Sequence, residues 1–383
     1  MVLYNQKVYQ KANSFIQLED RSNGEIVVSD IISHIKHQLR VVDNNKRIIL
    51  QRAVFDLEEK SNINNKETFK ILDHVKEEIK RINPDKLTEY FYYRYRYDIF
   101  PHTREIDNYP PLVQIEPTSM CNYRCVFCFQ TDKELTSKSN AHMGHMSLEL
   151  FKKIIDEIEG NVQGVTLASR GEPFINKNIC EMLEYMKGKF LATKINTNGS
   201  LLTDKIIRAL LCSEINTIVF SADAASETLY SKLRVNGNLK KVLNNVRRFN
   251  EIKAKEYPKN RSITRVSGVY YDKNQNIDDM KSVWGELVDQ IAFVEYCPWS
   301  NVYEKSANNI KTPCSDLWRR MFVWWDGRCN PCDADYLTTL DIGEFPKNTL
   351  NEIWNGSKYN ELRELHCNSK RQEKNVCSKC SVI

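Results

Sequence analysis

The chain has 383 residues, 41% of them apolar, which is enough for the core of one large domain and one or two smaller ones. Its 55 basic and 50 acidic residues leave a formal net charge of only +5, which does not indicate a nucleic-acid-binding protein. No apolar run approaches the roughly 18 residues of a membrane span, and the N-terminus MVLYNQKVYQKANSF lacks the apolar core of a signal peptide. We therefore expect a cytoplasmic protein with neither a nucleic-acid nor a membrane partner.

The first predicted domain, residues 1–110, is a helical N-terminal extension. It contains no proline up to about residue 83. Its segments 29–39 and 66–82 place apolar residues at the i, i+3, i+4, i+7 spacing of an amphipathic helix. Ser29 and Asn65 are candidate N-caps for these two helices.

Two shorter stretches of this extension differ from the helical pattern. The run RIILQ, beginning at Arg47, is the one β-like stretch that we identify in it. The run YFYYRYRYDIF, residues 90–100, alternates aromatic and arginine residues. It is consistent with a platform for a substrate or partner, but we favour a helix or strand edge that docks the extension onto the main domain.

The second predicted domain, residues 111–300, alternates strands with helices. The expected strands lie at 112–117, 164–169, 191–199, 215–223, 262–271 and 291–296, and the expected helices at 147–160, 177–189, 203–212, 239–253 and 277–290. Such alternation indicates parallel strands joined by right-handed crossovers. Six units suit an open barrel better than a closed eight-fold one, so the predicted fold class is α/β with a partial (β/α)6 barrel. Ligands of such folds gather at the C-terminal ends of the strands.

Twelve cysteines are many for a chain in a reducing compartment, so metal binding or catalysis explains them better than disulfides. Cys121, Cys125 and Cys128 have the spacing C-x3-C-x2-C directly after the first predicted strand. Thiolates in such loops bind zinc or iron–sulfur clusters. Three of them can hold three corners of a four-iron cluster and leave one iron open, whereas a zinc site would be completed by His142 or His145.

This spacing, with the aromatic Phe127 before the last cysteine, resembles the signature of the radical S-adenosylmethionine (radical SAM) enzymes. The resemblance implies a [4Fe–4S] cluster on Cys121, Cys125 and Cys128, with SAM chelating the open iron and Phe127 contacting the cofactor. In that family the reduced cluster cleaves SAM to a 5′-deoxyadenosyl radical, which abstracts hydrogen from a substrate C–H bond. The protein supplies position and seclusion, and the cofactor supplies the chemistry.

The segment SRGEP, residues 169–173, ends the second predicted strand and resembles the Gly-Gly-Glu-Pro segment of the same family. The resemblance implies that Gly171 and Glu172 contact the methionine amino group of SAM, and a carboxylate suits such a donor. Arg170 replaces the first glycine of the family pattern. This departure predicts either a reshaped loop or a charge near the substrate.

Later strand ends carry further residues of the family pattern. Asn198, in NTNG, is implied near the cofactor ribose, although a turn role for Asn-Gly is equally consistent. Ser221, at the end of the next strand, resembles the serine that contacts the ribose. Arg234 stands where several relatives bind the methionine carboxylate, a group that a guanidinium suits; a surface salt bridge is the alternative.

The third predicted domain, residues 301–383, is rich in cysteine and too small for a sizeable core of its own, so we expect a metal to stabilise it. Its cysteines are Cys314, Cys329, Cys332, Cys367, Cys377 and Cys380. Two C-x2-C pairs are also typical of a zinc ribbon. The layout resembles the SPASM and shorter twitch extensions of radical SAM enzymes, and the twitch-type aminocyclitol dehydrogenase in particular.

The twitch resemblance implies one auxiliary [4Fe–4S] cluster on Cys314, Cys332, Cys377 and Cys380. Cys367 is then surplus, and Cys329 remains an alternative to Cys314. A cluster with four protein ligands has no open iron for a substrate. We therefore expect it to accept an electron from a substrate radical, which favours a net oxidation.

The predicted function is a radical SAM oxidoreductase that oxidises a small polar molecule such as a sugar, aminocyclitol or polyol. An external one-electron donor, such as flavodoxin or ferredoxin, would reduce the first cluster. No catalytic base is identified; the candidates by position are Arg170, Glu295, Tyr270 and Asp335. The alternatives are maturation of a ribosomally made peptide, which the helical extension makes less favoured, and a non-catalytic iron–sulfur or zinc protein.

Overall fold

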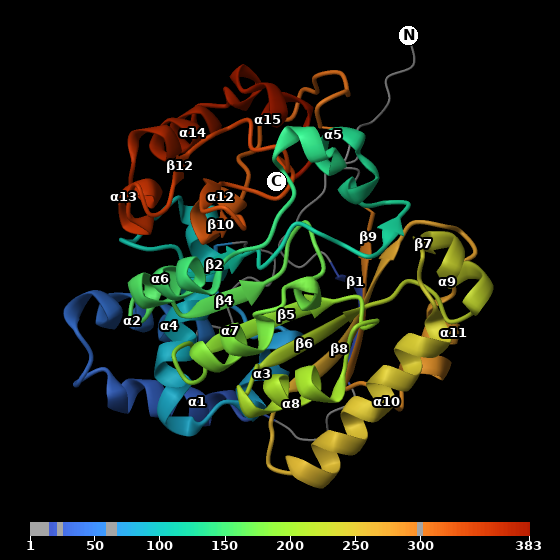
Figure 1. The fold of residues 1–383 in the computed structure, drawn as a ribbon. Coiled ribbons are helices and arrows are strands. Elements are labelled where there is room, and N and C mark those ends of the chain that lie inside the picture. The colour runs from blue at the N-terminus through green and yellow to red at the C-terminus, as the bar shows by residue number, and fades with distance from the viewer. Residues whose placement is uncertain (1–14, 21–25, 59–66, 297–301) are drawn as a thin grey trace.

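The computed structural model describes residues 15–20, 26–58, 67–296 and 302–383. Its main feature is a ten-stranded sheet in the order β1-β9-β8-β6-β5-β4-β2-β10-β11-β12 (Figure 1). The central strands are β2 (Leu112–Ile115), β4 (Gly164–Leu167), β5 (Ala192–Thr197), β6 (Thr217–Ser221), β8 (Ile263–Tyr270) and β9 (Gln290–Glu295). All neighbouring pairs among these six are parallel, so the predicted partial (β/α)6 barrel is confirmed.

Helices connect these strands, and all of them except the one over residues 227–233 lie where the sequence pattern places them. They are α6 (Leu148–Ile158), α7 (Ile179–Tyr185), α8 (Asp204–Cys212), α9 (Glu227–Leu233), α10 (Leu239–Glu256) and α11 (Ile277–Trp284). In α6 the Ser147 hydroxyl accepts a hydrogen bond from the Leu150 N–H, which caps the helix. Phe151 and Ile155 of α6 are fully buried in the main core, with Val165 of β4. These helices therefore cover one face of the sheet.

The N-terminal part contains α1 (Val28–Gln38), α2 (Asn44–Glu58), α3 (Asp73–Arg81) and α4 (Leu87–Thr103). The prediction of a helical extension is wrong for one segment, because β1 (Phe15–Asp20) is a strand that pairs antiparallel with β9 at the edge of the sheet. The run RIILQ lies inside α2 and is no strand. The sequence pattern missed β1 because its pairing partner is far away along the chain.

The predicted helix starts in this region also need correction. The helix α1 begins at Val28, with Val27 at its N-cap position, so Ser29 does not cap it. The segment expected to be helical from residue 66 becomes helical only at Asp73, because Phe69 lies in a stretch without regular secondary structure and buries its ring in a separate apolar cluster. Asn65 lies outside the described residues.

The aromatic and arginine-rich run 90–100 belongs to α4 and is almost wholly buried. Its residues Tyr90, Phe91 and Tyr95 pack with Leu112 of β2 in the second apolar cluster. The favoured prediction, that this run docks the N-terminal extension onto the main domain, is confirmed. Aromatic and arginine residues alternate along this run, but both kinds are buried because α4 is covered on several sides.

The C-terminal part joins the same sheet. Its elements are β10 (Arg320–Val323), β11 (Arg328–Asn330), β12 (Gly343–Glu344), α12 (Asp316–Arg319), α13 (Leu350–Trp354), α14 (Ser357–Cys367) and α15 (Asn375–Lys379). Strand β10 pairs in parallel with β2. The predicted boundary near residue 300 thus does not divide the sheet, and Figure 1 shows this red and orange part against β2. No helix among the described residues is long and apolar enough to cross a bilayer.

Candidate functional site

The three clustered cysteines lie beyond the end of β2, at the C-terminal ends of the parallel strands. Cys125 belongs to the short strand β3 (Arg124–Cys125), which pairs with β7 (Arg234–Val235), and Cys128 precedes a single 3-10 turn. The loop from Cys121 is fixed at its base, because the Glu172 N–H donates to the Met120 carbonyl at 2.8 Å. The sequence placed these cysteines correctly because a parallel sheet brings its strand ends to one edge.

The chemistry of these thiols fits a metal cluster. Burial raises the pKa of Cys121 to about 11 and that of Cys128 to about 12, and neighbouring thiols in the loop add to both shifts. Thiols that are buried together and costly to ionise alone become thiolates when a metal compensates their charge. Residues Cys121, Cys125 and Cys128 would hold the cluster.

No three His, Cys, Asp or Glu side chains in the described ranges are arranged to hold a single metal ion. This finding decides neither for nor against the zinc alternative with His142 or His145, and the four-iron cluster stays a prediction at this point.

Glu172 is buried at the end of β4 and is fixed by three donors. Its carboxylate accepts hydrogen bonds from the Thr197 hydroxyl at 2.8 Å and from the Asn198 and Phe174 N–H groups at 2.7 and 3.3 Å. Burial raises the pKa of Glu172 to about 7, although these hydrogen bonds oppose the shift. A preorganised carboxylate at this point suits an amino group, and contact with SAM stays a prediction.

Gly171 lies where the chain leaves no space for a side chain. A Cβ there would stand 2.2 Å from the Thr118 carbonyl oxygen and 2.5 Å from that of Met120. Glycine is therefore required so that the loop carrying Cys121 can pack directly on the end of β4. Its predicted contact with SAM is untested.

Arg234 is buried, so the surface-salt-bridge alternative is wrong. Its guanidinium pairs with Asp223 at 2.6 Å and approaches the Cys125 sulfur at 3.8 Å. Asp223 also accepts a hydrogen bond from the Val269 N–H at 2.6 Å. Asp223 lies two residues after Ser221 and was given no role from the sequence; the structure shows that it positions Arg234 beside the cluster loop.

Asn198 is connected to the cluster loop by its side chain. Its amide donates to the Asn122 side chain at 2.9 Å, and Asn122 donates to the Ser200 hydroxyl at 2.9 Å. Asn122 and Ser200 were not predicted, although Asn122 directly follows Cys121. Asn198 also begins the turn at Gly199, which has a φ of +73°, so the turn role is confirmed and contact with the cofactor remains a prediction.

Phe127 and Ser221 border the same region. The Phe127 ring packs against Tyr271 with centroids 5.6 Å apart and lies 5.8 Å from the Arg234 guanidinium. Ser221 ends β6 with a partly exposed side chain. The structure therefore brings all the predicted cofactor residues to one edge of the sheet.

Two of the four candidate bases are unsuited to that role. Arg170 is fully buried in an ion pair with Glu116, with contacts of 2.6 and 2.7 Å. Asp335 is buried and accepts hydrogen bonds from Tyr303, Thr339 and the Leu340 N–H. Both side chains are fully engaged by the protein.

The other two candidates stay accessible. Tyr270 and Glu295 face each other in register at the ends of β8 and β9, and Tyr270 is 40% exposed. Their position at the strand ends is compatible with a substrate role, which remains untested.

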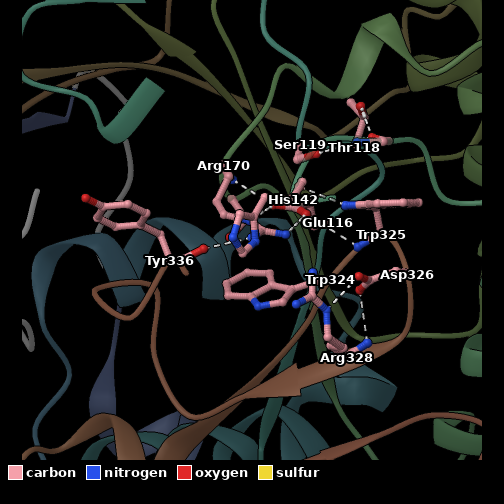
Figure 2. A network of polar contacts seen from close by, with 12 residues as sticks. Glu116, Thr118, Ser119, His142, Arg170, Trp324, Trp325, Asp326, Arg328 and Tyr336 are labelled. Carbon is pink, nitrogen blue, oxygen red and sulfur yellow. Dashed lines mark hydrogen bonds and ion pairs between the residues drawn. The ribbon is translucent and has the colours of Figure 1, made fainter. Parts of the chain in front are cut away.

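Arg170 instead connects the barrel to the C-terminal part (Figure 2). Its guanidinium donates to the Tyr336 carbonyl at 2.8 Å and lies 4.3 Å from the centroid of the Trp324 ring. Glu116 also accepts from the Trp325 N–H at 3.4 Å. Arg170 thus forms a buried contact between the two parts of the chain. This role explains why an arginine replaces the glycine of the family pattern.

The C-terminal cysteines divide into a group of four and two others. The pKa of the Cys332 thiol is raised mainly by burial, and also by Asp335, Cys314, Cys380 and Cys377. The charges of the other three thiols thus act on Cys332, which is compatible with a shared cluster. Their assignment as ligands remains a prediction.

The remaining two C-terminal thiols lie apart. Cys329 is buried in β11, where its sulfur contacts the Gly327 carbonyl, and the charges that act on it are those of Glu157, Asp326 and Glu344. Cys367 is exposed at the end of α14. The absence of a thiol among the charges that act on Cys329 favours Cys314 as the ligand, and this assignment stays a prediction.

Comparison with known families agrees with this geometry. The model of the radical SAM superfamily matches residues 115–282, and the model of the SPASM iron–sulfur cluster-binding domain matches residues 314–381. The chain is a radical SAM protein with a SPASM domain. Its radical SAM domain implies a [4Fe–4S] cluster and SAM, and its SPASM domain implies auxiliary iron–sulfur binding.

Curated relatives share part of this radical SAM protein. It is 32% identical over 111 residues to the tungsten-containing aldehyde ferredoxin oxidoreductase cofactor-modifying protein of Pyrococcus furiosus, covering 28% of this chain and 30% of that protein. It is 27% identical over 123 residues to the mycofactocin maturase MftC of Mycobacterium tuberculosis, covering 32% and 30%. The chain thus spans about a third of the length of these relatives.

Solved structures share the fold over a larger part. BtrN in complex with AdoMet and 2-DOIA has a TM-score of 0.50 at 16% identity, covering 72% of this chain and 94% of BtrN. SuiB of Streptococcus suis bound to the precursor peptide SuiA has a TM-score of 0.52 at 16% identity, covering 94% and 90%. At this identity the likeness shows the fold alone.

Proposed function

We propose that this radical SAM protein is an oxidoreductase that oxidises a small polar molecule, such as a sugar, aminocyclitol or polyol. With cluster and SAM bound, the site would supply a 5′-deoxyadenosyl radical that removes one hydrogen atom from a substrate carbon. Loss of the hydroxyl proton and of one electron from that carbon then leaves a carbonyl group. The electron that starts the reaction would come from an external donor such as flavodoxin or ferredoxin.

The observation that carries this proposal is the group of four thiols in the C-terminal part. Cys314, Cys332, Cys377 and Cys380 would give an auxiliary cluster four protein ligands, which leaves no open iron for a substrate. Such a cluster suits electron transfer, and an oxidation needs an acceptor for the departing electron. A redox-neutral rearrangement would not need one.

Maturation of a ribosomal peptide is the second candidate. One solved neighbour, SuiB, was crystallised with a precursor peptide and aligns with 94% of this chain, including most of its N-terminal part. The strand β1, which was not predicted, removes one reason for disfavouring this candidate, because the extension is not wholly helical.

The first test is the anaerobic content of iron, sulfide and zinc. We expect about eight irons per chain in the wild type and about four when Cys121, Cys125 and Cys128 are all replaced by Ala, because each four-iron cluster depends on its own thiolates. Cys212→Ala is the control, because this thiol is exposed and lies outside both groups; it should keep all eight irons.

A different metal content would redirect the proposal. About four irons plus one zinc, with all iron lost in the triple variant, would show a structural C-terminal site and remove the electron acceptor. Formation of 5′-deoxyadenosine by the reduced wild type would exclude a non-catalytic iron–sulfur protein. Binding of a precursor-type peptide by the wild type would favour the second candidate.

A further inference from the structure

A large polar cavity opens on the inner face of the sheet, below the cofactor region. Its volume is about 940 Å³, and it is lined by residues of β4, β5, β6 and β8 and by α3 and α4 of the N-terminal part. Figure 1 shows these blue helices beside the beginnings of the strands. Closed parallel barrels fill their interior with branched apolar side chains, so an open polar interior is a feature that needs an explanation.

The lining is strongly cationic. Ten Lys or Arg residues line it among the described residues, against four Asp or Glu residues. Lys194 of β5 and Arg265 of β8 project from the strands themselves, while Arg320 begins β10 beside β2. The whole chain has nearly balanced charge, so this excess is local and indicates a ligand of negative charge.

Most of the deep cations already have partners. Arg94 pairs with Asp98 at 2.8 Å, and Arg265 donates to the Gln290 side chain at 2.7 Å. Arg319 and Arg320 share the carboxylate of Asp316, at 3.1 and 3.2 Å. These contacts keep the guanidinium groups in place and neutralise only part of their charge.

Lys194 differs from these arginines. Lys194 lines the cavity, and no residue in the described part of the chain forms a hydrogen bond or ion pair with it, although the charge of Glu78 acts on it. Burial, with repulsion from Arg320 and Arg265, lowers the pKa of Lys194 to about 7. Lys194 is half-buried at the cavity wall, and an anion bound beside it would raise its pKa again.

The cavity opens at the beginnings of the strands, and its lining extends to neighbours of two cofactor residues. Asn196 of β5 and Ser267 of β8 line its upper part; Asn196 stands two residues before Asn198, and Ser267 lies opposite Ser221 in register. The Asn196 side-chain oxygen is buried and has no hydrogen-bond partner in the described chain. A ligand in the cavity would thus place one end near the cofactor and find a free acceptor there.

We propose that this cavity is the substrate site and that the substrate carries an oxyanion, a phosphate or a carboxylate, which Lys194 binds with Arg265 and Arg320. This proposal rests on the proposed function, and it specifies further that the small polar substrate is negatively charged. The volume is that of a small-molecule site, and the α3 and α4 helices wall it in, which favours a small molecule over a peptide. The hydrogen to be removed would lie at the Asn196 end.

The test is equilibrium binding to the full-length, iron-loaded chain, kept anaerobic and saturated with SAM so that the carboxylate site of the cofactor is filled. Isothermal titration calorimetry compares glucose 6-phosphate, glucuronate and glucose, which differ in their charged group. We expect glucose 6-phosphate or glucuronate to bind and glucose not to bind. Binding of glucose 6-phosphate would identify the oxyanion as a phosphate, and binding of glucuronate would identify it as a carboxylate.

The variant Lys194→Met tests the assigned residue. It should weaken binding of the anionic sugar by about tenfold or more, because it removes a charge-assisted contact from a buried site. Lys153→Met is the matched control, because Lys153 is an exposed lysine of α6 paired with Glu149, and it should bind as the wild type does. Iron content and circular dichroism verify folding, and Arg265→Gln replaces Lys194→Met if the latter does not fold.

Three results would overturn the proposal: no binding of either anionic sugar to the wild type, equal binding by the folded Lys194→Met variant, or tighter binding of a glutamate-rich peptide than of both sugars. None of these depends on catalysis. Cluster content and formation of 5′-deoxyadenosine by the wild type test the proposed function separately, so the two can fail independently.

Discussion

At the scale of single residues, Arg371 connects the C-terminal loops around the four grouped thiols. It is buried and donates hydrogen bonds to the carbonyl groups of Cys377, Cys380, Thr312 and Val382. It also acts to lower the pKa of the Cys314 and Cys377 thiols. A fixed cation at this place stabilises negative charge on the sulfurs and would favour the reduced form of a cluster held there.

We therefore expect Arg371→Gln to lower the midpoint potential of the auxiliary cluster. The estimated shift is roughly 60 mV, equivalent to a tenfold change for a one-electron couple. The measurement is a redox titration followed by electron paramagnetic resonance. Lys370→Gln removes an exposed charge one position away and should leave the potential unchanged; an equal shift in both variants would show an effect of net charge alone.

At the scale of elements, a buried ion pair joins β2, the end of β4 and the segment after β10. Arg170 and Glu116 are both fully buried, and Tyr336 and Trp324 from the C-terminal part complete the contacts of Arg170 (Figure 2). Removing one member of such a pair leaves an uncompensated charge, whereas replacing both by apolar residues is often neutral.

Arg170→Met should therefore lower the free energy of unfolding by about 3–5 kcal/mol. The double variant Arg170→Met/Glu116→Leu should recover most of that loss, which thermal unfolding of both proteins can show. If Arg170 instead served the substrate, the single variant would keep its stability and lose only activity.

Among the unpredicted elements, the strands β1 and β10 were missed for the same reason. Each is short, and each pairs with a strand far away along the chain, β9 and β2 respectively. Periodicity within a short window reports the exposure of neighbouring positions, but it carries no information on a distant pairing partner. The six central strands were predicted because they alternate regularly with amphipathic helices along the chain.

At the scale of the whole molecule, the N-terminal helices close the inner face of the sheet and enclose titratable groups there. His74 of α3 lines the cavity and lies 3.3 Å from the Arg94 guanidinium. Burial and the charge of Arg94 lower the pKa of His74 to about 2. The folded protein thus keeps this imidazole neutral, while the unfolded chain protonates it below its ordinary pKa of about 6.5.

Because the unfolded state then binds more protons, the contribution of His74 is fully present above about pH 6.5 and is lost as the pH falls. The loss is at most about 1.4 kcal/mol for each pH unit below that value. His74→Gln should remove this part, so its melting temperature should fall less than that of the wild type between pH 7.5 and 5.5. Parallel curves for the two proteins would contradict the assignment.

The sequence by itself determined the six-unit barrel and the gathering of Cys121, Cys125 and Cys128 with the later strand ends. The reason is that hydrophobic periodicity and cysteine spacing are local, and a parallel sheet brings its strand ends to one edge. Only the tertiary structure decided the pairing of β1 and β10, the engagement of Arg170 with Glu116, and the separation of Cys329 from the other thiols. It alone brought Lys194, Arg265 and Arg320 around one cavity, because residues distant in the chain meet there through sheet register and the packing of α3 and α4.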